Sequence, residues 1–490
     1  MKKMVALFII FLLVVLSATV ICFQDDFFGE THSEPFHVGV TYGGDSIQEA
    51  LLLIDKVKDY TNLFVLQSGM LQHNLSSVEQ VCDYAVDSGL DIIVYFSSYN
   101  AQKDATAAFL NTAQTRWGNH FLGLYYGDES GGKMLDDVAH LYNITDFGDI
   151  HKDKFGYSVV QKNGSISCAS TYMLAGTITL DYYNTDTENG TTTTYFTNGT
   201  IRLFNYYTED FTKNQVLLYQ PNGTVILQKD WTEYQVVTDK GNISQFEPYQ
   251  NIYDSRPLPT YEQAATGYVE NLKPTLDWVH NQTDANIFTS DYALYWWDYQ
   301  SGYDVVFAEL GWNNTVAQEI GLVRGAAKMQ DKNWGTIITW TYNHPPYLTN
   351  GEEMYDQMRT SYECGANYVI IYNHYDEGMN NTYGTLQEEH FQALEQFWNK
   401  VVKDPFAAER GSIKSEAVLV LPQNYGWGMR TQNDKIWGIL DADESSQQIW
   451  EQTHRLLEQH GTKLDIVYED PKFPVEGKYP TVVYWNQTSG

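Results

Sequence analysis

Residues 304–342, DVVFAELGWNNTVAQEIGLVRGAAKMQDKNWGTIITWTY, contain one complete strand–helix–strand unit. A short apolar run rich in β-branched residues predicts a strand over Asp304–Leu310. Apolar residues at helical spacing predict a helix over Val316–Gln330, and a second β-branched run predicts a strand over Gly335–Tyr342. A helix that joins two short buried strands is typical of a parallel sheet.

The same unit recurs from His37 to about Asp404. The predicted strands are His37–Tyr42, Leu63–Gln67, Asp91–Ser97, Phe121–Tyr126, Ala285–Thr289, Asp304–Leu310, Gly335–Tyr342 and Tyr368–Tyr372. The predicted helices include Val78–Asp87, Asp104–Trp117, Tyr261–His280, Val316–Gln330, Glu352–Cys364 and Leu386–Val402. Eight βα units in order predict an α/β fold, a (β/α)8 TIM barrel built from residues 36–153 and 254–404.

Two further segments differ from the barrel. Residues 154–253 are rich in Thr and Tyr and carry Asn-Gly pairs at 163, 189, 198 and 222. Asn-Gly between alternating runs indicates hairpins, so we expect an antiparallel β insert after strand four. The insert is expected to act as a lid or substrate wall; the alternative is a purely structural insert. Residues 413–490 contain strand patterns at Ala417–Pro422, Leu464–Tyr468 and Thr481–Trp485 and a helix pattern at Ser445–His460. They predict a small α/β domain that resembles the opening half of a flavodoxin-like domain.

The N-terminus indicates export. Lys2 and Lys3 precede an apolar run, Met4–Val20, so residues 1–23 are typical of a signal peptide or an uncleaved signal anchor. Eleven N-x-[ST] triplets, which predict a glycoprotein, begin at Asn74, Asn143, Asn163, Asn189, Asn198, Asn222, Asn242, Asn281, Asn313, Asn380 and Asn486. We expect an extracellular or cell-surface protein, with membrane anchoring through the N-terminal segment as one option; the oligomeric state is left open.

Composition excludes several classes of protein. The 490 residues include 30 Lys plus Arg against 62 Asp plus Glu, a formal net charge of −32, which excludes a nucleic-acid binder because phosphate recognition needs clustered positive charge. The four cysteines form no CxxC pair, and the chain has no GxSxG, P-loop, HExxH or strand-following GxGxxG motif. We therefore expect neither a metal nor a cofactor.

Catalytic residues of a TIM barrel lie at the carboxyl ends of its strands. Three glutamates there are the candidate catalytic residues: Glu129 after strand four, Glu309 in strand six and Glu377 after strand eight. Continued side-chain alternation from Tyr125 points Glu129 into the barrel and leaves Asp128 for local hydrogen bonds. Glu309 ends an apolar run, and burial there would raise its pKa, as a general acid requires.

Aromatic and polar side chains crowd the same strand ends. Aromatic rings stack on the apolar faces of pyranoses, while carboxylates and amides bind the hydroxyls, so the rim suits a carbohydrate. The candidate substrate-binding residues are Asp128, Tyr126, Asp291, Trp296, Trp312, Trp340, Tyr342, Asn373, His374 and Asp376.

The overall plan resembles the barrel glycoside hydrolases. The segment Tyr372–Gly378 is similar to the W-N-E-W-x-E-G pattern of endomannosidase-like families: Asn373, Glu377 and Gly378 match it, and His374 stands where that pattern has its first Glu. Of the catalytic positions, the resemblance therefore implies an acid/base role only for Glu377. The end of strand seven also lacks the nucleophilic Glu that the large retaining clan carries there.

These features lead to one main hypothesis: an extracellular glycoside hydrolase-like protein that cleaves glycosidic bonds by two-carboxylate chemistry. Glu129 would protonate the leaving oxygen, while Glu309 or Glu377 attacks the anomeric carbon or activates water. Carboxyls about 5–5.5 Å apart would mean retention of configuration, and about 6.5–9.5 Å inversion. The alternative is a catalytically inactive glycan-binding or cell-surface structural protein on the same type of barrel.

Overall fold

The computed structural model describes residues 35–97, 103–136, 139–140, 149–153, 156–160, 166–174, 177–184, 189–196, 198–207, 213–229, 233–246, 259–312, 315–342, 344–375 and 381–487. The predicted signal peptide or anchor lies outside these residues, as do Asp376 and Glu377. No helix within the described ranges is long and apolar enough to cross a membrane.

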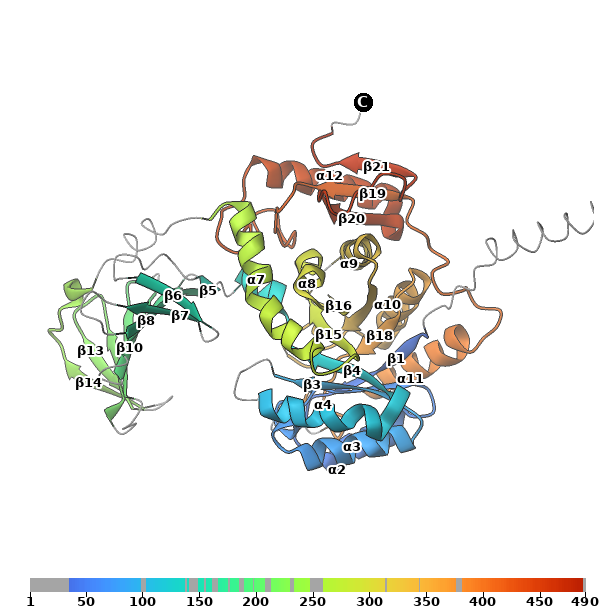
Figure 1. The fold of residues 1–490 in the computed structure, drawn as a ribbon, viewed down its shortest axis with the longest axis horizontal. Helices are drawn as coiled ribbons and strands as arrows, with labels where there is room; N and C mark the ends of the chain where they lie inside the picture. Colours follow the sequence, from blue (N-terminus) through green and yellow to red (C-terminus); the bar gives the residue numbers. More distant parts are fainter. Residues whose placement is uncertain are drawn as a thin grey trace, which may run out of the picture. The chain divides into compact units, whose positions relative to one another are not determined.

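A closed barrel of parallel strands forms the centre of the fold, in the order β1-β18-β17-β16-β15-β4-β3-β2 (Figure 1). Its strands are β1 (His37–Tyr42), β2 (Leu63–Leu66), β3 (Asp91–Phe96), β4 (Phe121–Tyr126), β15 (Asn286–Asp291), β16 (Val305–Leu310), β17 (Asn333–Ile338) and β18 (Tyr368–Ile371). The predicted (β/α)8 barrel is confirmed. Strand β17 ends four residues earlier than predicted, so Trp340 and Tyr342 lie in the loop that follows it.

Helices alternate with these strands (Figure 1). They are α2 (Ile47–Val57), α3 (Leu75–Asp87), α4 (Lys103–Trp117), α7 (Tyr261–His280), α9 (Val316–Gln330), α10 (Gly351–Glu363) and α11 (Glu388–Phe397), which continues as a π-helical turn, η7 (Trp398–Val402). Short 3-10 segments are η1 (Leu71–His73), η3 (Gly118–His120), η6 (Ile243–Gln245) and η8 (Gly461–Lys463). Two seven-residue helices, α5 (Ser130–Asp136) and α8 (Tyr295–Ser301), were not predicted.

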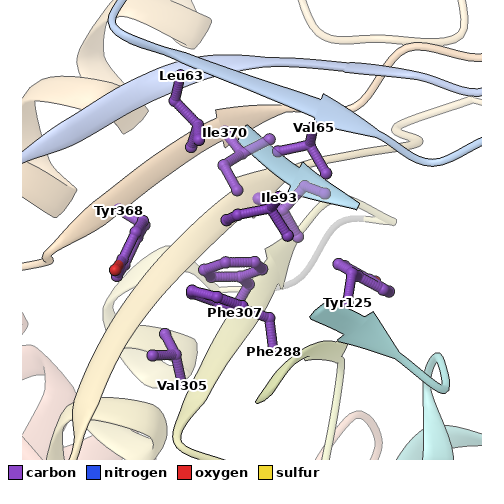
Figure 2. Packing of buried hydrophobic residues seen from close by; sticks show 10 residues of the cluster. Leu63, Val65, Ile93, Tyr125, Phe288, Val305, Phe307, Tyr368 and Ile370 are labelled. Atoms are coloured by element: carbon purple, nitrogen blue, oxygen red, sulfur yellow. The ribbon is translucent and has the colours of Figure 1, made fainter. Parts of the chain in front are cut away.

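Large apolar side chains fill the barrel interior (Figure 2). They come from alternate residues of the strands, because successive side chains of a strand point to opposite faces. The Phe288 and Phe307 rings stack with centroids 5.6 Å apart, and Tyr368 lies edge-on to Phe288 at 5.3 Å. The interior is therefore a packed core and not a pore, which leaves the strand ends for chemistry.

The segment between β4 and β15 forms an antiparallel sheet, as predicted, with strand order β14-β13-β12-β11-β10-β9-β8-β7-β6 and β5 paired with β8. Its strands are β5 (Ala139–His140), β6 (Asp149–Asp153), β7 (Gly156–Val160), β8 (Ile166–Leu174), β9 (Thr177–Asn184), β10 (Asn189–Tyr195), β11 (Ile201–Tyr207), β12 (Gln215–Tyr219), β13 (Val225–Gln228) and β14 (Tyr234–Thr238). The sheet thus begins before residue 154.

Two of the Asn-Gly pairs form hairpin turns in this sheet. Gly199 and Gly223 adopt positive φ angles of 83° and 87° between β10 and β11 and between β12 and β13. Asn189-Gly190 instead begins strand β10, so the turn prediction was wrong at that pair. The pair at 163 lies outside the described residues.

The C-terminal segment forms a small parallel sheet, β20-β19-β21, with one long helix. Its elements are β19 (Ala417–Leu421), α12 (Glu444–His460), β20 (Leu464–Tyr468) and β21 (Thr481–Tyr484). Gly321 of α9 packs against β20 so closely that a Cβ there would lie 2.7 Å from Leu464 O. The Arg324 guanidinium of α9 donates to Asp465 Oδ1 at 2.7 Å, so this sheet is fixed to a barrel helix by a buried ion pair.

Candidate active site

Two carboxylates that are far apart in sequence are linked at the carboxyl ends of three adjacent strands, β4, β15 and β16. The Ser290 hydroxyl donates to Glu309 Oε1 at 2.7 Å. The Tyr125 hydroxyl donates to Asp128 Oδ1 at 2.5 Å and lies 2.7 Å from Ser290 Oγ. Tyr125 also belongs to the barrel core, so the packed interior sets the position of this network.

The turn after β4 brings Asp128 and Glu129 into one cluster. Gly127 has a φ of +80° and Glu129 a φ of +52°, so the chain leaves the extended conformation after Tyr126. The Glu129 amide donates to Ser290 O at 3.0 Å, which fixes the turn against β15. The prediction that strand alternation continues to Glu129 was therefore wrong, because positive φ angles end the strand geometry. The predicted local hydrogen bonding of Asp128 is confirmed by Tyr125, three residues before it.

Burial makes Glu309 the most perturbed carboxyl of the cluster. Its side chain is 4% exposed. Burial raises the pKa of Glu309 well above its usual range, and the nearby carboxylates of Glu129 and Asp128 raise it further. Because no cation within the described part of the chain forms an ion pair with Glu309, the protonated form is favoured.

The environment of Glu129 contains both a cation and other carboxyl groups. Its side chain is 32% exposed and its Oε2 lies 3.3 Å from the Lys133 ammonium. Burial and the Asp128 carboxylate raise the pKa of Glu129, while Lys133 and a side-chain hydrogen bond with Glu309 oppose that rise. The Glu129 carboxylate in turn raises the pKa of Glu309, so the pair favours a state that holds one proton.

Lys133, which was not predicted as a site residue, is the cation of this cluster. It lies on α5, four residues after Glu129, and its ammonium donates to Asp128 O at 2.8 Å. Its distance to Asp128 Oδ2 is 3.8 Å. The i,i+4 spacing of Glu129 and Lys133 was visible in the sequence, but it carries meaning only if a helix begins at residue 130.

Asp291 accepts hydrogen bonds from backbone amides. Its buried carboxylate accepts from the amides of Gly131 at 2.5 Å and Gly132 at 2.7 Å, in the first turn of α5. It also accepts from the Tyr292 and Ala293 amides. Burial raises the pKa of Asp291 to about 7, against the lowering effect of these amides. Asp291 was predicted to bind substrate, but its oxygens are occupied in fixing α5, the helix that carries Lys133.

Aromatic side chains gather at the ends of β16, β17 and β18. The Trp340 ring contacts Tyr347, Tyr372 and His374 at centroid distances of 5.3, 5.7 and 5.4 Å. The Trp312 amide donates to Trp340 O at 2.7 Å, and the Trp312 side chain is 49% exposed. Tyr342 is also exposed and lies edge-on to His344. These rings lie at the strand ends where the sequence predicted an aromatic rim.

The remaining predicted residues fall into different places. Asn373 is fully buried, and its Oδ1 accepts from the Thr385 amide and hydroxyl at 3.0 and 3.1 Å, so it holds a loop. Trp296 packs against Tyr468 and Phe473 of the C-terminal segment, because it lies on the unpredicted helix α8, and is not a rim residue. Tyr126 is buried beside the cluster. Among the described residues, no three His, Cys, Asp or Glu side chains are placed to hold a metal ion.

Comparisons with known proteins give matches among solved structures alone. No family model matches the chain. No curated protein matches it either. Among solved structures, a variant of GH5_18, a glycoside hydrolase from Streptomyces cattleya in complex with Manβ1-4GlcNAc, matches with a TM-score of 0.45 and 11% sequence identity, over 92% of this chain and 99% of that chain.

Proposed function

We propose that the protein is an extracellular glycoside hydrolase in which Glu129 and Glu309 form the catalytic pair. The observation that carries this proposal is that both glutamates converge on Ser290 at the strand ends. The Ser290 hydroxyl donates to Glu309 Oε1 at 2.7 Å, and the Glu129 amide donates to Ser290 O at 3.0 Å. Both lie at the strand ends where TIM-barrel enzymes assemble their catalytic residues. Glycoside hydrolysis needs one protonated and one ionised carboxyl, and the buried Glu309 and the Lys133-paired Glu129 supply two such different environments.

The environments of the two residues assign their roles. Glu309 is buried and its pKa is raised well above the usual range, so we assign it as the general acid that protonates the leaving oxygen. Glu129 is more exposed and faces Lys133, so it is the carboxylate that attacks the anomeric carbon or activates water. This assignment reverses the roles expected from the sequence, where Glu129 was the acid.

The proximity of Glu129 and Glu309 favours retention of configuration. An inverting enzyme needs room for a water between carboxyls about 6.5–9.5 Å apart, whereas a retaining pair lies about 5–5.5 Å apart. Glu129 is close enough to Glu309 to raise its pKa, so we propose the shorter, retaining arrangement. Glu377 stays a third candidate from the endomannosidase-like segment.

Export and substrate class rest on other features. The apolar N-terminal run and the eleven glycosylation triplets support an extracellular or membrane-anchored protein. The exposed Trp312 and Tyr342 rings support a carbohydrate ligand. For the C-terminal domain we keep the flavodoxin-like class, since the order β20-β19-β21 corresponds to 2-1-3.

The test compares turnover and binding on a panel of aryl glycosides and cell-surface polysaccharides. We expect Glu129→Gln and Glu309→Gln each to lower kcat about 10²–10⁴-fold on any substrate that the parent cleaves. The matched control is Glu319→Gln, since Glu319 is equally buried but lies on α9 and accepts from Tyr295 OH at 2.5 Å. Full activity of both strand-end variants would refute the catalytic pair.

A second candidate function is glycan binding without catalysis. It is favoured by the end of β17, where Trp340 packs with His374 and where the retaining clan carries its nucleophile. Binding of a glycan by the parent protein without turnover would support this alternative against the hydrolase.

A further inference from the structure

A pocket of about 360 Å³ lies between the ends of β3 and β4 and helix α7. Its lining includes Asp128 and Lys133 from the carboxyl cluster, and Tyr95 and Tyr126 from the strand ends. The volume is within the range of small-molecule sites, about 300–1,000 Å³. Because Asp128 belongs both to this lining and to the hydrogen-bonded network of Glu309, a ligand in the pocket would lie next to the proposed catalytic pair.

Helix α7 contributes one continuous stripe to the pocket. Asn271, Leu272, Thr275 and Leu276 all line it, and the pairs Asn271–Thr275 and Leu272–Leu276 are four residues apart, so the members of each pair lie one above the other on the helix. The stripe offers an amide and a hydroxyl beside two apolar side chains. The pocket thus combines hydrogen-bonding groups with an apolar wall, which is the combination that a pyranose ring requires.

Tyr126 supplies a second observation. It lines the pocket, it is 1% exposed, and its hydroxyl has no hydrogen-bond partner among the described residues. Buried hydroxyls normally have a hydrogen-bond partner, so we expect a ligand hydroxyl or a water to pair with the Tyr126 hydroxyl. Burial raises the pKa of Tyr126 to about 12, which keeps this hydroxyl protonated and able to donate.

The charges around the pocket select against an anion. Lys133 is already engaged by Asp128 O and by Glu129, and the carboxylate of Asp128 faces the same space. A carboxylate or phosphate on the ligand would meet this negative group, whereas sugar hydroxyls can donate to it. The lining therefore suits a neutral, hydroxyl-rich ring.

We propose that this pocket is a binding subsite for one neutral pyranose unit of the substrate, held by Asp128, Tyr126, Asn271 and Thr275. The proposal rests on the proposed glycoside hydrolase function and adds the residues that would bind the sugar. It gives α7, the helix that follows the β insert, a direct role in recognition.

The experiment fills the pocket from the α7 side. Thr275→Trp occupies the space, and Asn271→Ala removes one hydrogen-bonding group at an exposed position that tolerates truncation. Lys273→Trp is the matched control, because Lys273 is exposed, does not line the pocket and forms an ion pair with Asp277 on the same helix. Equilibrium binding of methyl glucoside, mannoside, galactoside and N-acetylglucosaminide is measured by ligand-observed NMR, with each variant made in the Glu309→Gln background. The value of kcat/KM is measured separately, with each variant made in the parent that keeps Glu309, for any aryl glycoside that the parent cleaves.

We expect at least one of these sugars to bind. The binding affinity and kcat/KM should fall at least tenfold in Thr275→Trp and severalfold in Asn271→Ala. Both quantities should stay unchanged in Lys273→Trp. Loss of binding in a chain that cleaves no glycoside supports the subsite and refutes the hydrolase. Turnover and binding that stay within twofold of the parent in Thr275→Trp and Asn271→Ala overturn the subsite and leave the hydrolase standing. Absence of binding and of turnover with every sugar also overturns the subsite. If Thr275→Trp does not fold, Asn271→Ala alone decides between these outcomes.

Discussion

Lys133 sets the charge state of the carboxyl cluster. Its ammonium lies 3.3 Å from Glu129 Oε2 and 3.8 Å from Asp128 Oδ2, and it lowers the pKa of both carboxyls against the effect of burial. In the proposed mechanism Glu129 must be ionised for the enzyme to act. Lys133 therefore acts through Glu129, as a positioning and electrostatic residue.

Replacing Lys133 by Met should shift the acid limb of the pH–rate profile upward. Without the ammonium, the pKa of Glu129 rises, so a higher pH is needed to ionise it. Because both side chains are partly exposed, we expect a shift of about half to one pH unit in kcat/KM. Lys273→Met, which removes an exposed ammonium from α7, is the control and should leave the profile unchanged. An unshifted acid limb in Lys133→Met would contradict the role of Lys133.

Single residues show where prediction from the sequence succeeded and where it failed. Glu309 could be predicted, because a carboxyl that ends the apolar run Val305–Leu310 marks a strand end. The structural role of Asp291 could not, since it depends on the backbone amides of Gly131 and Gly132 in α5. Positive φ angles and backbone amides leave no periodic pattern in a sequence.

At the scale of elements, helix α9 is shared between the barrel and the C-terminal sheet. The Arg324 guanidinium is 6% exposed and donates to Asp465 Oδ1 at 2.7 Å and to Thr462 O at 2.7 Å. Asp465 is fully buried. The ion pair thus forms where β20 meets α9, out of contact with water.

Removal of this cation should destabilise the protein strongly. Arg324→Met leaves the buried Asp465 carboxylate without its partner, which typically costs about 3–5 kcal/mol in the free energy of unfolding. The matched control is Arg359→Met, which breaks the i,i+4 pair with Glu363 on the surface of α10 and should cost about 1 kcal/mol or less. Urea unfolding followed by tryptophan fluorescence measures both. Equal losses in the two variants would contradict the importance of burial.

Long elements with a clear period were predicted well. Strands β1 and β4 and helices α7 and α9 have the expected ends, because alternation and helical spacing continue over many residues. Helices α5 and α8 escaped prediction because seven residues give only two turns of periodicity. The consequence was the wrong placement of Trp296, which faces the C-terminal segment from α8.

The molecule as a whole combines a charge of −32 with several buried carboxyls whose protonated form is favoured. Glu319 is the simplest of these to isolate. Burial raises the pKa of Glu319 from 4.5 to about 8, against the lowering effect of the Tyr295 hydroxyl. Below pH 4.5 the folded and unfolded states are both protonated at this residue, and above pH 8 both are ionised. Between these limits the folded state holds more protons, so stability falls as pH rises.

Glu319→Gln should therefore flatten the dependence of thermal stability on pH. We expect the variant to be more stable than the parent at pH 8, by on the order of 2–4 kcal/mol, and to differ little from it at pH 4.5. Thermal unfolding between pH 4.5 and 8.5 gives the two curves. The control, Glu458→Gln, changes an exposed carboxyl of α12 and corrects for the loss of one surface charge. Parallel curves for Glu319→Gln and the parent would contradict the buried protonated state.

The pairing of β4 with β15 also determines when the barrel can form during synthesis. Gly123 pairs with Asn286, and 286 − 123 = 163 residues separate them, with the antiparallel sheet encoded in between. At a translation rate of about 5–20 residues per second, a ribosome needs about 8–33 s to make the partner of β4. The hairpins of the inserted sheet pair locally and can close within that interval. Strands β1 to β4 have to wait with an open edge at β4, where unpaired amides and carbonyls invite contact with other chains.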